Sequence, residues 1–139
     1  MAATPPEPRS PVFDPKVVAD LLETFGDPAL VVKVIRLFLD EAPRQVNAVA
    51  EGLSRGEPEE VRRSAHSLKS SAISIGAKDL SERSAKVEEL TKAGRLDDVL
   101  PLLEPLRGSL ERVSAVLAGE AARLASSGAG GSVTPQDIQ

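Results

Sequence analysis

The sequence predicts an all-α protein, an antiparallel four-helix bundle with an additional short N-terminal helix. Successive segments carry apolar residues at helical spacing, and glycine and proline mark the boundaries between them. No segment shows the period-two alternation of a half-buried strand. Aromatic residues make up only 2% of the chain, so the core must consist of Leu, Val, Ile and Ala, a composition that suits packed helices.

The first two helices are predicted from repeated start signals. Asp14-Pro15 supplies an N-cap residue followed by a proline at the first helical position, and Gly26 ends the segment. Asp27-Pro28 repeats the signal, and apolar residues then continue at helical spacing toward Gly52. Because Pro43 removes a backbone hydrogen bond inside this run, at a cost of about 3 kcal/mol, we expect a kink or break just before it.

The third helix is expected to begin at Pro58 or Glu59 and to run to Ile75, with Gly76 as a left-handed C-cap. Gly76 therefore has a structural role in this prediction.

Glycine and proline also mark the boundaries of the last two predicted helices. The fourth should cover residues 79–93 and close at Gly94. The fifth should run from about residue 96 to residue 124, interrupted or bent by Pro101 and Pro105.

One folded domain is predicted for residues 13–125. Residues 1–12 are proline-rich with little apolar content, and residues 126–139 are rich in glycine and serine. We expect both terminal segments to be disordered. Four long helices can close a core within one chain, so we expect a monomer.

Charge and composition exclude several function classes. The formal net charge is −4 and there is no cysteine, so neither nucleic-acid binding nor a disulfide framework nor a thiolate zinc site is favoured. No segment approaches the roughly 18 apolar residues of a membrane span, and no signal peptide is recognisable. We expect a cytoplasmic protein that binds no metal of its own.

His66 is the only histidine and the leading candidate for covalent chemistry. At about 100° per residue, it projects away from the apolar stripe of its helix, which is predicted to be buried. Its neighbours on the outer face are cationic, small or isolated apolar residues: Arg62, Arg63, Lys69, Ser70 and Ile73.

Two interpretations of this face compete. A surface histidine among cations and serines is most often simply solvated. Alternatively, a neutral imidazole nitrogen acts as a nucleophile, and the cations stabilise an anion that becomes attached to it. Phosphate is the obvious anion, since Lys69 lies one turn away and Ser70 or Ser71 can donate a hydrogen bond.

The run Ala65-His66-Ser67-Leu68-Lys69-Ser70-Ser71-Ala72, followed by Gly76-Ala77, resembles the signature of histidine-containing phosphotransfer (HPt) domains. The shared features are a histidine, an apolar residue two positions later, a lysine three later, small residues next, and a glycine ten after the histidine. Residues 38–43 also resemble a segment of bacterial members. One departure is Ser70, where many members carry glycine.

The resemblance implies a phosphotransfer intermediate of a two-component phosphorelay, without its own ATP-binding site. His66 would be the phosphoacceptor through Nε2, and Lys69 would stabilise the phosphate, with Ser70 and Ser71 in secondary roles. The partners would be a response-regulator receiver domain, a hybrid histidine kinase, or both. Mg²⁺ is expected on the receiver, and no separate activating base is assigned to the imidazole.

Partner docking is predicted beside the histidine. Ile73 lies two turns after His66 on nearly the same stripe, where a fully exposed isoleucine gains nothing in an isolated domain. Ile73 would form an apolar docking patch with Arg62 and Arg63 as its polar rim. The alternative is that Ile73 packs against the neighbouring helix.

Two further classes remain to be weighed. A histidine-kinase dimerisation domain has an acidic residue directly after its histidine and a proline shortly beyond, where this chain has Ser67 and Ser71. A noncatalytic helical adaptor, in which His66 is incidental, is the alternative function.

Overall fold

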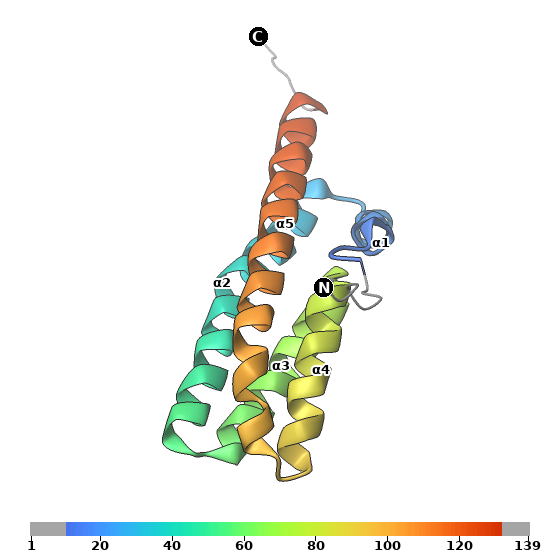
Figure 1. Cartoon of the computed structure of the whole chain (residues 1–139). Coiled ribbons are helices and arrows are strands. Elements are labelled where there is room, and N and C mark those ends of the chain that lie inside the picture. Colours follow the sequence, from blue (N-terminus) through green and yellow to red (C-terminus); the bar gives the residue numbers. More distant parts are fainter. Residues whose placement is uncertain (1–10, 132–139) are drawn as a thin grey trace, which may run out of the picture.

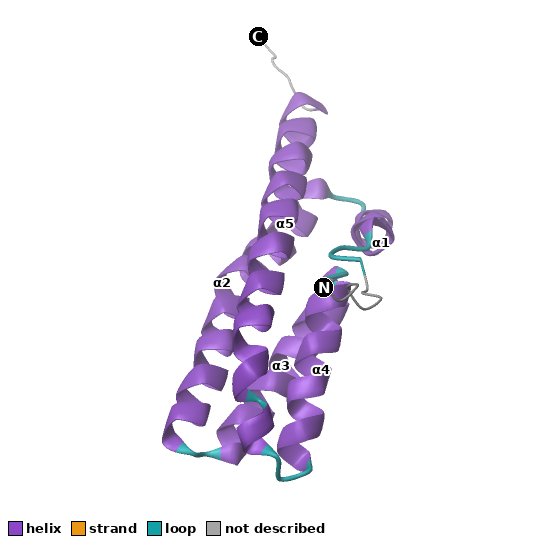
Figure 2. Ribbon diagram, viewed as in Figure 1, coloured by secondary structure: helices purple, strands orange, loops and turns teal. Residues whose placement is uncertain are grey.

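The computed structural model describes the backbone of residues 11–131 and the side chains of residues 11–126. This part of the chain contains five α-helices, two short 3-10 turns and no strand (Figure 2), which confirms the all-α prediction. The elements in chain order are α1 (Pro15–Phe25), α2 (Pro28–Arg55), α3 (Pro58–Ile75), α4 (Lys78–Lys92), the turns η1 (Leu96–Asp98) and η2 (Leu100–Leu102), and α5 (Leu103–Gly131).

Helices α2 to α5 run antiparallel to their chain neighbours and form the bundle (Figure 1). Helix α2 packs against both α3 and α5, α3 packs against α4, and α4 contacts α5. The shorter α3 and α4 end before α2 and α5 do, and α1 lies at this step (Figure 1). There α1 contacts α2 and α3.

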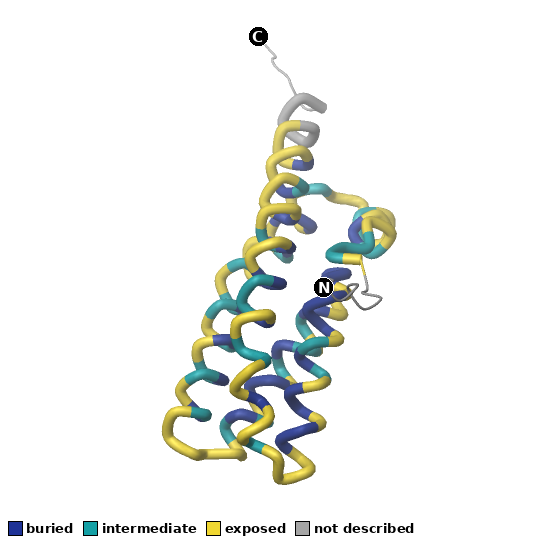
Figure 3. The backbone as a smooth tube through the Cα atoms, viewed as in Figure 1, coloured by how far each residue is buried: buried dark blue, intermediate teal, exposed yellow. Residues whose placement is uncertain are grey.

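The core is aliphatic except for Phe38, which is also buried, although the composition predicted only Leu, Val, Ile and Ala. Dark blue positions follow the inner faces of the helices in Figure 3. The larger core cluster joins α1 and α2 to one half of α3 and most of α5. A second cluster, containing Val49, Val61 and Val87, fills the end of the bundle where α2 turns into α3. Burial of these side chains from water is the main stabilising contribution.

The predicted helix starts and stops of α1 and α3 are confirmed. The Asp14 side chain accepts a hydrogen bond from the Lys16 backbone N–H at 3.0 Å, and Gly26 is left-handed. Helix α3 begins at Pro58 and ends at Ile75, with Gly76 in the left-handed region at φ 85°. The Asp14 oxygen at the start of α1 and the glycine at the end of each helix satisfy backbone groups that the helix leaves unpaired, whereas the start of α3 has no side-chain cap hydrogen bond.

Helix α2 lacks the break that Pro43 predicts. It continues through Pro43 without a break, because Ala42 and Val46 on either side are buried in the core and tertiary packing holds the helix. The helix ends at Arg55 with Gly56 as the left-handed C-cap, in agreement with the prediction that Gly56 and Pro58 separate it from the next helix. Gly52 is a packing residue, since an added Cβ would lie 2.8 Å from Val61 Cγ2.

The entry into α5 also differs from one continuous helix. The segment after α4 forms η1 and η2, with Pro101 in the second turn, and α5 begins only at Leu103. Pro105 lies in the first turn of α5, where a missing N–H breaks no helical hydrogen bond. Helix α5 continues to Gly131, beyond the predicted domain boundary at residue 125. Residues 1–10 of the predicted arm and 132–139 of the predicted tail lie outside the described residues.

The turn between α3 and α4 is fixed by close contacts around Gly76. The Asp14 backbone N–H donates to the Gly76 carbonyl at 2.8 Å, and the Asp79 N–H donates to the Pro11 carbonyl at 3.1 Å. A Cβ on Gly76 would lie 2.8 Å from the Asp14 carbonyl oxygen. The segment before α1 therefore locks the turn that joins α3 to α4.

A buried charge cluster ties the start of α4 to α5. Asp79 Oδ2 accepts hydrogen bonds from Arg83 Nε at 2.8 Å and from Ser109 Oγ at 2.7 Å, and Arg112 lies 3.6 Å away. Burial alone raises the pKa of Asp79, but the hydrogen bonds from Arg83 and Ser109 and the two guanidinium charges outweigh it and hold the pKa below its ordinary value of 3.8. The ionised carboxylate thus stabilises the fold.

The depressed pKa of Asp79 predicts acid sensitivity. The contribution of Asp79 is fully present above its unfolded-state pKa and is lost as pH falls through its folded-state pKa. We expect Asp79→Asn to lower the free energy of unfolding at pH 7 by about 2–4 kcal/mol and to flatten its acid dependence. Denaturant unfolding across pH measures both effects. Asp40→Asn, which removes only an exposed ion pair with Arg44, is the control; equal acid profiles for wild type and Asp79→Asn would contradict the prediction.

Candidate functional site

Helix α3 presents His66 on the face that points away from the core. The residues predicted to form its buried stripe are all buried: Val61, Ala65, Leu68, Ala72 and Ile75. The His66 side chain, on the opposite side, is 56% exposed. The helical periodicity therefore correctly predicted the direction of the imidazole.

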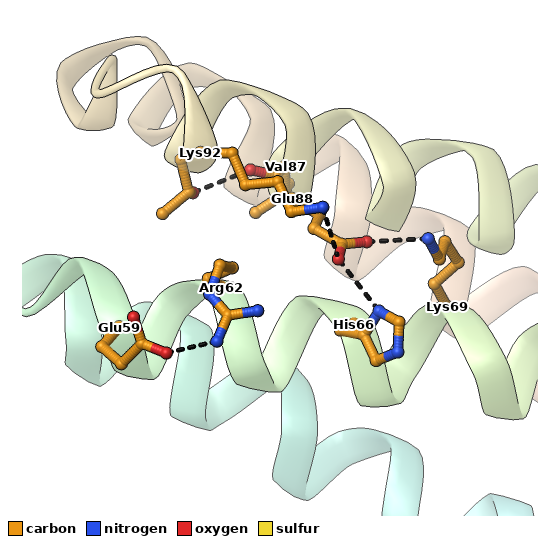
Figure 4. Close-up of polar contacts among 8 residues, drawn as sticks. Glu59, Arg62, His66, Lys69, Val87, Glu88 and Lys92 are labelled. Carbon is orange, nitrogen blue, oxygen red and sulfur yellow. Dashed lines mark hydrogen bonds and ion pairs between the residues drawn. The ribbon is translucent and has the colours of Figure 1, made fainter.

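The imidazole does not stand alone, because Glu88 of α4 contacts it (Figure 4). His66 Nδ1 lies 2.9 Å from Glu88 Oε2, and the Glu88 side chain is only 5% exposed. Figure 4 shows Nδ1 facing α4 and the second ring nitrogen, Nε2, pointing away from it. Within the described residues, Nε2 makes no hydrogen bond.

Glu88 also forms ion pairs with Lys69 and Lys92. Lys69 Nζ lies 2.8 Å from Glu88 Oε1, and Lys92 Nζ lies 3.7 Å from Oε2 (Figure 4). The hydrogen bond from Lys69 is the largest influence and lowers the pKa of Glu88; burial opposes it, while His66 reinforces it. Glu88 is therefore an ionised carboxylate beneath the exposed ring.

This arrangement fixes the protonation pattern of the neutral imidazole. A carboxylate oxygen only accepts hydrogen bonds, so in the neutral ring the proton sits on Nδ1 and donates to Glu88. The lone pair of Nε2 then faces the outside of the molecule. A ring held in this way can act as a nucleophile toward an electrophile brought by another molecule.

Of the remaining predicted site residues, Arg62 is already paired. Arg62 lies one turn before His66, and its guanidinium contacts the carboxylate of Glu59, a further turn back along α3 (Figure 4). Arg63 and Ser70 are exposed, and Ser71 is half-buried. The structure therefore brings Lys69 into the polar network of His66 through Glu88, while Arg63, Ser70 and Ser71 make no ion pair or side-chain hydrogen bond within the described residues.

Ile73 is 60% exposed on the same helix. Packing of this side chain into the neighbouring helix, the alternative weighed from the sequence, does not occur. An exposed isoleucine two turns from the imidazole leaves an apolar contact for another molecule.

Glu88 is the residue that sequence reasoning missed, and a signal for it was present. His66 and Glu88 lie equally far from Ala77, on opposite sides of the α3–α4 turn. In an antiparallel helix pair, residues placed symmetrically about the turn come opposite each other. The same register sets Arg62 opposite Lys92, and both line one hollow.

Two other features of the described residues bear on function. No cluster of three or more His, Asp or Glu side chains in this part of the chain is arranged to hold a metal ion. None of its helices is long and apolar enough to cross a membrane.

Comparisons with known proteins give a family and a fold. The family model of the Hpt domain matches residues 33–116, which include both His66 and Glu88. No curated protein matches the sequence.

Two solved structures illustrate the shared fold. Histidine-containing phosphotransfer protein B of Pseudomonas aeruginosa is 23% identical with a TM-score of 0.77, covering 82% of this chain and 97% of that one. A histidine-containing phosphotransfer protein from maize is 22% identical with a TM-score of 0.72, covering 84% and 86% of the two chains.

The Glu88 contact predicts a single tautomer for His66. We expect long-range ¹H–¹⁵N NMR of the neutral ring to show the proton on Nδ1 in wild type. Glu88→Ala removes the acceptor, so the ring should shift toward the tautomer mixture of free imidazole. Glu89→Ala, at the exposed neighbouring position on α4, serves as the control. The same tautomer population in wild type and Glu88→Ala would contradict the assignment.

Proposed function

The chain belongs to the Hpt domain family, and from this premise we propose that it carries a phosphoryl group on His66 as an intermediate of a two-component phosphorelay. The phosphoryl group would pass to or from an aspartate of a response-regulator receiver domain. The observation that carries the proposal is the exposed imidazole whose Nδ1 is held by a buried carboxylate while Nε2 faces outward.

The geometry supports Nε2 as the attacking atom. In transfer from a receiver, the Nε2 lone pair attacks phosphorus, a P–N bond forms, the P–O bond of the acyl phosphate breaks, and the receiver's aspartate leaves as a carboxylate. The ring keeps its Nδ1 proton and becomes positively charged. Glu88, 2.9 Å from Nδ1, stabilises that charge without taking the proton.

Lys69 is proposed as the residue that stabilises the phosphoryl oxygens. It follows His66 by one turn on the same helix, and its ammonium currently contacts Glu88 at 2.8 Å. From there the ammonium can turn toward the oxygens of an incoming phosphate and donate charge-assisted hydrogen bonds to them. Ser70 and Ser71 take secondary roles, and their small side chains leave room for a partner.

The partner would supply what this chain lacks for the reaction. We propose a receiver domain or hybrid histidine kinase as partner, with Mg²⁺ held by the receiver, where it would neutralise charge on the transferring group. The chain itself would be a carrier without an ATP-binding site. We further propose a monomer that acts in the cytoplasm.

Docking is proposed on the exposed face of α3 that carries His66. Ile73 would supply the apolar contact, with Arg63 and the Glu59-paired Arg62 at its polar rim.

The decisive experiment is transfer from a panel of phosphorylated receiver domains to wild type and His66→Gln. We expect label on wild type only, and we expect it to be acid-labile and base-stable, as a phosphorus–nitrogen bond requires. Circular dichroism controls the fold of the variant. Label that persists in His66→Gln would overturn the site, while no label from any donor on a folded wild type would favour the adaptor function.

A second prediction concerns Ile73. We expect Ile73→Asp to reduce transfer efficiency by about tenfold, equivalent to ~1.4 kcal/mol of docking, with unchanged helical content and thermal stability. Leu100→Asp is a matched control, because Leu100 is 64% exposed but lies in the turn between α4 and α5. Equal losses for the two variants, or a cooperative loss of fold in Ile73→Asp, would rule out a specific docking role.

A further inference from the structure

Glu88 has three nitrogen partners, two of them lysine ammonium groups. Lys69 Nζ lies 2.8 Å from Oε1, His66 Nδ1 lies 2.9 Å from Oε2, and Lys92 Nζ lies 3.7 Å from the same Oε2. The first two distances are those of hydrogen bonds, whereas the third is an ion-pair distance without a hydrogen bond. Lys92 is thus the outer member of the group.

Phosphorylation of His66 would give Lys69 a second anionic partner besides Glu88. The phosphoryl group brings up to two negative charges to a ring one turn from Lys69. An ammonium that turns toward the phosphoryl oxygens weakens its contact with Glu88. Because Glu88 is only 5% exposed, water cannot readily replace that contact, and a buried carboxylate with fewer partners is costly.

Lys92 can replace the contact that Glu88 loses when Lys69 turns away. Its side chain is 60% exposed, compared with 29% for Lys69, and it follows Glu88 by one turn of α4. Lys92 also borders open hollows on both sides, of about 440 and 600 Å³, so its ammonium has space to move. A loose, exposed ion pair contributes little to stability while Lys69 is in place.

We propose that Lys92 is a positioning residue that takes over Glu88 when His66 is phosphorylated, which releases Lys69 to the phosphoryl oxygens. This inference deepens the proposed function, on which it rests for the phosphorylated state. Lys92 acts through Lys69 and does not touch the phosphoryl group itself. Its side chain matters in the phosphorylated protein and is dispensable in the resting one.

The test uses chemical phosphorylation, so that it needs no receiver. Phosphoramidate transfers its phosphoryl group to an imidazole: the Nε2 lone pair forms a P–N bond to the ring, the P–N bond of the reagent breaks, and its already protonated nitrogen leaves as ammonia while the ring keeps its Nδ1 proton. Since His66 is the only histidine, ³¹P NMR observes one phosphohistidine site. Titration of that signal near neutral pH, where the P–N bond survives, measures the proton affinity of the phosphohistidine, which an ammonium close to the phosphoryl oxygens lowers.

The expected results depend on the background. Lys69→Gln should raise the proton affinity of the phosphohistidine, and Lys92→Gln should raise it by about two- to threefold, because Lys69 then stays on Glu88. In the Lys69→Gln background, the additional Lys92→Gln change should have almost no effect. Lys92→Arg should behave like wild type. Lys86→Gln, which removes an exposed charge on α4 that makes no ion pair within the described residues, is the control.

Two outcomes would overturn the inference. An unchanged titration in Lys92→Gln would show that Lys92 does not assist Lys69. Equal shifts from Lys92→Gln with and without Lys69 would show that Lys92 acts on the phosphoryl group directly by its charge. The expected coupling, found in a protein that no receiver labels, would support the inference and overturn the proposed relay function instead.

Discussion

The register between α3 and α4 is the constraint on which the candidate site depends. It is set at the turn, where the Asp14 backbone N–H donates to the Gly76 carbonyl at 2.8 Å and a side chain on Gly76 would collide with Asp14. The Asp79 cluster fixes the start of α4 against α5. With both constraints in place, Glu88 lies opposite His66. A shift of one residue would rotate Glu88 away by about 100°.

Glu88 converts an ordinary surface histidine into an oriented one. A solvated imidazole samples both tautomers and several rotamers, whereas a buried carboxylate at 2.9 Å selects one tautomer and one ring direction. The same carboxylate forms ion pairs with Lys69 and Lys92, which places two positive charges beside the ring and leaves Nε2 unblocked. Glu88 therefore both orients the His66 ring and holds the two lysine ammonium groups close to it.

Helix geometry gives α3 one buried face and one exposed face. One face is buried and built from small and medium aliphatic side chains, which allows α2 and α4 to approach closely. The opposite face carries His66 and Ile73, both more than half exposed. Helix α3 thus presents an imidazole and an apolar side chain to the same side of the molecule. The family membership and this geometry point to the same kind of chemistry.

The sequence by itself determined the all-α bundle, the starts and glycine-capped ends of α1 and α3, and the outward direction of His66, because these depend on local signals and on the period of a helix. Only the tertiary structure decided the rest. Helix α2 continues through Pro43 because its flanking residues are buried, and the absence of a side chain at Gly52 allows close packing against Val61. Glu88 reaches His66 through the packing of two helices, and such a contact between distant residues depends on register, which the spacing within one helix does not contain.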